Sequence, residues 1–104
     1  MAKTVIRKKT EVLVDMPLLP RIEKLAETAG IEIYTMMPTR SGASEKGRWY
    51  DDRVTGGAGT KVVFTALSSQ SKSDALIEAL EPLLDTYGII VTRSDVEVIR
   101  SEKF

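Results

Sequence analysis

The sequence contains no cysteine and no histidine in its 104 residues. Without cysteine, the chain has no disulfide, no thiol nucleophile, no redox pair and no thiolate zinc site. Without histidine, it lacks the commonest general base near neutral pH and every Ser-His-Asp or Cys-His arrangement. Catalysis would have to depend on carboxylates, lysine, tyrosine or a bound cofactor. We therefore predict neither catalytic nor metal-binding residues.

The chain also lacks an excess of charge of either sign, because 15 basic residues balance 15 acidic ones. A net charge of zero gives no overall attraction to nucleic acid or to an anionic membrane. No apolar stretch approaches the ~18 residues that a membrane span needs, so we expect a cytoplasmic protein with no nucleic acid partner and no membrane insertion. Four basic residues near the start are interpreted as a solvated lead-in segment: Lys3, Arg7, Lys8 and Lys9.

Hydrophobic patterning predicts four strands within one domain that spans residues 1–104. They are expected from Glu11 to Met16, from Ile31 to Met37, from Lys61 to Leu67 and from Ile89 to Arg100, the last with an interruption near Ser94-Asp95.

Two helices alternate with these strands. The first has apolar residues at helical spacing, ends at Gly30, and presents Ile22, Leu25, Ala26 and Ala29 to the core. The second begins at a capping-box-like pair, Ser71 and Asp74, and ends at Gly88. Its expected core face consists of Leu76, Leu80, Leu83 and Tyr87, and Pro82 is expected to kink it.

The order of these elements predicts an α+β, ferredoxin-like βαββαβ fold, with a four-stranded antiparallel sheet and both helices on one face. The other face would then be open to water, and we expect Tyr34, Met36, Val63 and Leu67 on it. An exposed apolar face of this size is typical of an interface. We therefore expect a closed oligomer in which the sheets pack against each other.

Residues 38–60 interrupt the pattern and contain five of the seven glycines. Three interpretations stay open: a disordered insertion, a partner-binding arm centred on Arg48, Trp49 and Tyr50, or an anion-binding loop. For the last, backbone N–H groups and guanidinium groups would come from Thr39, Arg40, Ser41, Gly42, Ser44 and Arg48. Residues 56–61 lack the spacing of a phosphate loop and are interpreted as a hinge.

Three stretches in this arrangement resemble the PII signalling protein superfamily, most closely the PII-like proteins of inorganic-carbon metabolism that include a carboxysome-associated member. Ile33-Tyr34-Thr35 looks like the family's entry to the second strand. The run from Ser41 to Ser44, with Arg48 after it, looks like the start of the carbon-type T-loop. Asp85-Thr86-Tyr87-Gly88-Ile89-Ile90 looks like the segment at the short B-loop.

The resemblance implies a homotrimer that binds an adenine nucleotide in the clefts between subunits and changes the conformation of a long flexible T-loop, here about residues 38–60. It also implies a role for particular residues, carried over by position. Those roles are adenine contact for Thr35 and Thr65, B-loop backbone for Gly88, Ile89 and Ile90, phosphate contact for Ser44, Arg48 and Arg100, and the T-loop base beside the phosphates for Arg40, Ser41 and Gly42.

The sequence departs from the family at Ile89, where PII proteins have a lysine after the B-loop glycine. The loss of that phosphate contact favours ADP or AMP over ATP. Bicarbonate as a second ligand is implied only by the carbon-type relatives, as is a partner such as a bicarbonate transporter or a carboxysome-associated protein. No covalent cofactor is expected. Two other functions stay open: a small enzyme that uses carboxylates such as Asp51 and Asp52, and an amino-acid-type effector domain.

Overall fold

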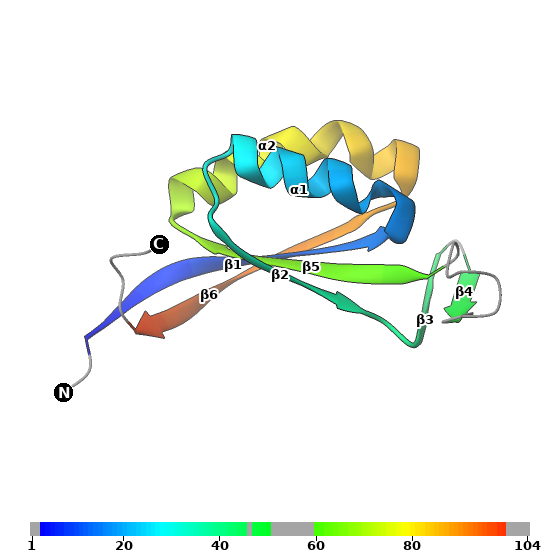
Figure 1. The fold of residues 1–104 in the computed structure, drawn as a ribbon, viewed down its shortest axis with the longest axis horizontal. Helices are drawn as coiled ribbons and strands as arrows, with labels where there is room; N and C mark the ends of the chain where they lie inside the picture. Colours follow the sequence, from blue (N-terminus) through cyan, green and yellow to red (C-terminus); the bar gives the residue numbers. More distant parts are fainter. Residues whose placement is uncertain (1–2, 46, 51–59, 100–104) are drawn as a thin grey trace.

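The computed structural model describes residues 3–45, 47–50 and 60–99. Its main sheet has four antiparallel strands in the order β2-β5-β1-β6, and both helices lie on one face of it (Figure 1). The predicted α+β, ferredoxin-like fold is confirmed. The elements are β1 (Thr4–Asp15), η1 (Met16–Leu18), α1 (Leu19–Thr28), β2 (Ile33–Pro38), β3 (Ser41–Ser44), β4 (Gly47–Tyr50), β5 (Lys61–Ser68), α2 (Gln70–Tyr87) and β6 (Ile90–Ile99).

The core lies between the sheet and the two helices. Along β5 every second residue is buried, beginning at Val62 and including Phe64, because alternate side chains of a strand point to opposite faces. The expected helix faces are largely confirmed, with Ile22 and Ala26 of α1 and the core leucines of α2 buried. Tyr87 is an exception: it is 41% exposed in the last turn of α2, where the helix runs past the edge of the core.

The first strand begins seven residues before the predicted start at Glu11, so Arg7, Lys8 and Lys9 of the basic lead-in segment are part of it. From Thr4 to Leu13, β1 pairs with β6, so backbone hydrogen bonds to a partner strand form this part despite its charged sequence. Lys8 makes an ion pair with Asp95 on the neighbouring strand. The predicted interruption at Ser94-Asp95 is wrong, because the same pairing continues through both residues.

Helix α2 begins one residue earlier than predicted and runs uninterrupted through Pro82 to Tyr87. Its N-cap is Ser69 and not Ser71: the Ser69 side chain accepts a hydrogen bond from the Lys72 backbone N–H. Proline removes the hydrogen bond to the carbonyl four residues before it. That carbonyl belongs to Glu78, an exposed residue, so water can satisfy it.

The side-chain direction of β2 differs from the prediction. Tyr34 lies opposite Ala66 and Met36 opposite Phe64, so both face the helices, while Ile33, Thr35 and Met37 face the open side. Cross-strand neighbours share a face, and a shift of one residue exchanges the two faces of a strand. The expected positions of Tyr34 and Met36 on the open face are therefore wrong.

The open face of the sheet nevertheless carries the expected apolar surface. Val63 and Leu67 lie on it, as predicted, since their neighbours on β5 point to the helices. A row of four apolar side chains crosses all the strands at one end: Met37, Val63, Leu13 and Ile90. Met37 is 64% and Ile90 44% exposed. In the described part of the chain nothing covers this row, which supports the expectation of an interface.

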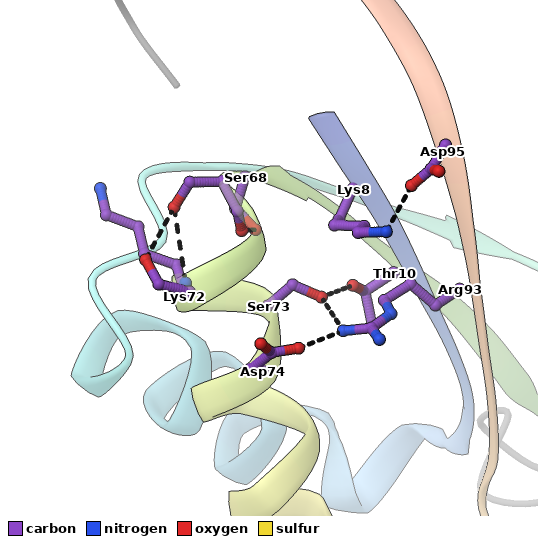
Figure 2. Close-up of polar contacts among 10 residues, drawn as sticks. Lys8, Thr10, Ser68, Lys72, Ser73, Asp74, Arg93 and Asp95 are labelled. Atoms are coloured by element: carbon purple, nitrogen blue, oxygen red, sulfur yellow. Dashed lines mark hydrogen bonds and ion pairs between the residues drawn. The ribbon is translucent and has the colours of Figure 1, made fainter. Parts of the chain in front are cut away.

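A buried pair of hydroxyl groups joins α2 to the sheet (Figure 2). The Oγ1 of Thr10 in β1 and the Oγ of Ser73 in α2 are 2.9 Å apart, and both residues are fully buried. Arg93 of β6 donates to the Ser73 hydroxyl at 3.3 Å and to Asp74 at 2.6 Å. Hydroxyls in such a position must bond to each other, because no water reaches them.

Ser73→Ala should therefore lower the free energy of unfolding by about 1–3 kcal/mol, because Thr10 keeps a buried hydroxyl without its partner. Thr10→Val in the same chain removes that orphan, so the double variant should lose less than the sum of the two single variants. Urea unfolding at fixed protein concentration measures all three. Ser71→Ala, at an exposed position of the same helix, is the control and should change stability by less than about 0.5 kcal/mol. Additive losses would contradict the pairing.

Tyr34 attaches β2 to α1. Its ring centroid lies 5.1 Å from that of Phe64, and its hydroxyl donates a hydrogen bond to Glu23 at 2.8 Å. This hydrogen bond, burial and the charges of Glu23 and Glu27 raise the pKa of Tyr34 from 10.0 to about 12. The neutral phenol is thus the form that the fold favours.

Stability should respond to this shift at high pH. Below pH 10.0 the phenol is neutral in both the folded and the unfolded chain, and its contribution is complete. Between pH 10.0 and about 12 the unfolded chain ionises first, so the contribution of Tyr34 falls as pH rises. Urea unfolding across this range should show the stability difference between wild type and Tyr34→Phe shrinking with pH. A difference independent of pH would contradict the assignment.

Candidate functional site

A short hairpin formed by β3 and β4 occupies part of the region predicted as an irregular loop. The strands pair from Ser41 opposite Tyr50 to Ser44 opposite Gly47, and they form a sheet separate from the main one. Gly47, with φ of 119°, follows the turn and adopts a conformation that favours glycine. Strand alternation puts Gly42, Ser44 and Trp49 on one face of the hairpin, while Arg48 and Tyr50 share the other.

The two central aromatic residues of the hairpin have different environments. Trp49 folds back against the protein: its Nε1 donates to Thr39 Oγ1 at 2.8 Å, and the Lys61 ammonium lies 5.4 Å from its ring centroid. Tyr50 is 59% exposed, and the Arg48 guanidinium lies 5.7 Å from its ring centroid. Of the proposed partner-binding arm, only the Arg48–Tyr50 face is therefore available to another molecule.

A groove with a volume of about 290 Å³ lies between this hairpin and the junction of α2 with β6. Ser44 and Glu45 form the hairpin side. The opposite side consists of Leu84 near the end of α2 and the three residues of the junction, Gly88, Ile89 and Ile90. Four residues predicted as ligand contacts, far apart in the sequence, thus line one groove: Ser44, Gly88, Ile89 and Ile90.

Gly88 shapes this junction. It caps α2 in the left-handed conformation, with φ of 62° and ψ of 31°, and its N–H donates to the carbonyl of Leu84 at 3.0 Å. The chain then turns, so that the Ile89 side chain is 6% exposed in the core and Ile90 begins β6. The predicted helix cap is confirmed, and the groove depends on the turn that it makes.

The other predicted contacts lie elsewhere on the chain. Thr35 and Thr65 lie opposite each other on the open face of the sheet, in one row with Glu11 and Thr92. The edge strands β2 and β6 are three strand spacings apart, so Thr35 is separated from Ile90 of the groove by ~14 Å or more.

The T-loop candidates divide in the same way. Arg48 faces away from Ser44 across the hairpin, and Gly42 lies beneath the Trp49 ring. Arg40 and Ser41 are exposed where the hairpin begins. Arg100, Asp51, Asp52 and the glycines of residues 56–59 lie outside the described residues.

The sequence reasoning missed several residues of this region. Glu45 follows a predicted contact directly, and Leu84 is a leucine next to the core face of α2, 38% exposed. Each residue offered a weak signal in the sequence. Glu45 is adjacent to Ser44, and Leu84 is an apolar residue outside the predicted core face of α2. Lys61 was taken only as the start of a strand, and nothing in its local sequence indicates the contact with Trp49.

The lining of the groove is mixed in character. Its described lining combines apolar side chains with one hydroxyl and one carboxylate, and no lysine or arginine is part of it. A second hollow, of about 400 Å³, is lined by Glu27, Gly30, Ile31, Glu32 and Tyr34 and contains none of the predicted contacts. Within the described ranges there is no group of three acidic side chains placed to hold a metal ion. Among the same residues no helix is long and apolar enough to cross a membrane.

The fold and the groove define a ferredoxin-like domain in which a loop hairpin borders a candidate ligand site. The family described as nitrogen regulatory protein P-II matches residues 7–103. The chain therefore belongs to the P-II family, as its sequence motifs had suggested. Among curated protein sequences there is no significant match.

Solved structures of PII-like proteins share this fold. One is CPII, a nitrogen regulatory PII-like protein from Thiomonas intermedia K12, bound to ADP, AMP and bicarbonate. It has a TM-score of 0.92 at 21% identity and covers 100% of this chain and 98% of its own. A putative PII-like signalling protein from Thermus thermophilus has a TM-score of 0.83 at 21% identity, over 98% of each chain. The apo form of CPII gives 0.77 at 19% identity, over 96% of this chain and 99% of its own.

Substitution of Gly88 tests whether the left-handed backbone conformation at the end of α2 contributes to stability. Gly88→Ala should lower the free energy of unfolding by about 1–2 kcal/mol, because a Cβ is unfavourable in the left-handed region. Gly88→Asn should lose clearly less, because asparagine tolerates this conformation. Thermal or urea unfolding measures both. Equal losses in the two variants would show that the conformation of Gly88 is not what matters.

Proposed function

We propose that this PII-like regulator binds an adenine nucleotide, with ADP or AMP favoured, in the clefts between the subunits of a homotrimer. The observation that carries the proposal is the groove itself. It brings Ser44 from the hairpin to Gly88, Ile89 and Ile90. These are residues to which the family resemblance assigns ligand contact, and they belong to segments 40 or more positions apart in the sequence.

The geometry of one chain supports a site completed by a second copy. A small-molecule pocket usually encloses roughly 300–1,000 Å³ and buries about 70–90% of its ligand. The described residues form an open groove of about 290 Å³, which is below that range. Thr35 and Thr65, the proposed adenine contacts, lie toward the opposite edge of the sheet from Ile90. Packing of copies around the open sheet face would bring such an edge to the groove of a neighbour.

The charged side chain in the described lining of the groove favours a nucleotide with few phosphates. Glu45 places a negative charge at the wall, and Ile89 offers no cation. Each further phosphate charge would meet the same repulsion. In this proposal Ser44 and the backbone of Gly88 to Ile90 hold the ligand. Arg40, Ser41, Gly42, Arg48 and Arg100 complete the phosphate contacts when the hairpin and the neighbouring copy close on it.

Bicarbonate is the proposed second ligand. CPII has been solved with ADP and bicarbonate and with ADP, AMP and bicarbonate, which supports a small anion as a ligand in addition to a nucleotide. Arg40 and Arg48 are exposed on the hairpin of this chain and could supply the guanidinium groups that such an anion needs.

The proposed output is a change of hairpin conformation that a partner protein reads. The ligand would shift the population between hairpin conformations by binding one of them more tightly. The partner would act in inorganic-carbon uptake or carboxysome function, for example as a bicarbonate transporter. In this proposal the protein is one cytoplasmic domain over residues 1–104 and performs no catalysis.

Calorimetry against AMP, ADP, ATP and bicarbonate, combined with light scattering, tests the proposal. We expect a mass of three chains, tighter binding of AMP and ADP than of ATP, and a change of nucleotide affinity when bicarbonate is added. Glu45→Gln should improve ATP binding more than AMP binding, because it removes a charge that more phosphates feel more strongly. Absence of nucleotide binding, or a monomeric mass, would overturn the proposal. Steady nucleotide turnover would instead support the enzyme alternative.

A further inference from the structure

Trp49 is the main contact of the hairpin with the end of the main sheet. Its Nε1 donates to Thr39 Oγ1 at 2.8 Å, and the same hydroxyl donates to the carbonyl of Lys61 at 2.7 Å. The Thr39 N–H donates to that carbonyl as well, at 3.0 Å. The indole is thereby connected to the point where β2 ends and β5 begins.

Lys61 holds the ring from the other direction. Its ammonium lies 5.4 Å from the Trp49 ring centroid and 2.7 Å from Oδ1 of Asp15, at the end of β1. The Lys61 side chain is 18% exposed, so the cation–π contact is partly shielded from water, which strengthens it. One aromatic side chain therefore contacts residues at the ends of β2 and β5, and through Lys61 reaches β1.

Gly42 leaves room for this arrangement. It lies opposite Trp49 in the hairpin, and a Cβ at Gly42 would overlap Cζ2 and Cη2 of the indole. Because the overlap is with ring atoms, any larger residue would push the ring away. Gly42 is also a proposed phosphate contact through its backbone, and in this structure its missing side chain accommodates Trp49.

The Trp49 contact with Thr39 and Lys61 attaches the hairpin to the rest of the protein. Ser44 and Glu45 line the groove on the side that faces the α2–β6 junction. Its own sheet contains only four residue pairs and is not hydrogen-bonded to the main sheet. Figure 1 shows it beyond the end of β2 and β5. Ser44 and Trp49 share one face of the hairpin, so the position of one restricts the other.

We propose that Trp49 is a latch: a positioning residue that holds the hairpin across the end of the sheet so that Ser44 and Glu45 face the groove. A ligand in the groove and the closed latch then stabilise each other, because both need the same hairpin position. By linkage, opening the latch lowers the affinity for the ligand by the same factor by which the bound ligand shifts the equilibrium toward the closed latch. This inference rests on the proposed nucleotide site but concerns Trp49, which is not a proposed ligand contact.

Trp49→Leu is the decisive variant, because Trp49 is not a proposed ligand contact. It should weaken ADP and AMP binding by about 5–50-fold, within the range typical of coupling between sites. Gly42→Ala keeps the backbone that the proposal assigns to phosphate and adds only a Cβ that displaces the Trp49 ring, so it should have a similar effect. It also keeps the only tryptophan of the chain as a probe. Its fluorescence should shift to longer wavelength as the indole leaves Thr39 and Lys61, and ADP should partly reverse the shift.

The matched control is Tyr50→Leu. Tyr50 is the neighbouring aromatic residue, on the opposite face of the hairpin and 59% exposed. Its loss leaves the Trp49 contacts in place and removes an exposed ring contact with Arg48, a proposed phosphate residue, so ADP affinity should change far less than in Trp49→Leu. Trp49→Phe keeps a ring but removes the Nε1–H donor, so it should fall between wild type and Trp49→Leu. Circular dichroism and light scattering verify that each variant keeps its fold and mass.

Amide hydrogen exchange without ligand separates the latch from the nucleotide site. Faster exchange in residues 41–50 of Trp49→Leu and Gly42→Ala, but not of Tyr50→Leu, supports the latch even if wild type binds no nucleotide. In that case the proposed nucleotide binding is wrong and the latch proposal is still supported. Unchanged exchange in both Trp49→Leu and Gly42→Ala overturns the latch proposal. Faster exchange with unchanged ADP affinity overturns the positioning role, because the hairpin would then be free without consequence for the groove.

Discussion

The two helices cover one face of the four-stranded sheet, and β5 shows what this requires of the sequence. Its buried positions point to the helices, while Val63, Thr65 and Leu67 alternate with them and point to the open side. An apolar row from Met37 to Ile90 therefore remains on the open face of a single chain. One-sided coverage thus accounts for both the stable core and the surface that a second copy can bury.

The same geometry divides the candidate site. Elements at the end of the sheet bring Ser44 to Gly88 and Ile90, while Thr35 and Thr65 stay on the open face toward the other edge. The hairpin reaches its position through contacts that differ in kind from those of the core: one indole hydrogen bond, one cation–π contact and the absence of a Cβ at Gly42. A small number of such contacts can hold a segment in place and still allow it to move, as the segment of a regulator must.

Much of the fold could be predicted because local patterns and tertiary packing agree. The helix faces of α1 and α2, the cap at Gly88 and the strand β5 followed directly from periodicity. The predictions failed where the local pattern was ambiguous. Both faces of β2 are apolar, so alternation could not tell which of Tyr34 and Thr35 faces the helices, and the charged start of β1 gave no sign of its pairing with β6.

The sequence by itself determined the order of elements and the glycine cap, because these depend on neighbours within a few positions. Only the tertiary structure decided which face of β2 is covered, that Trp49 meets Thr39 and Lys61, and that Ser44 meets Gly88. These contacts join residues of different strands and helices. Their formation depends on how the sheet and the helices pack together, which no local pattern in the chain encodes.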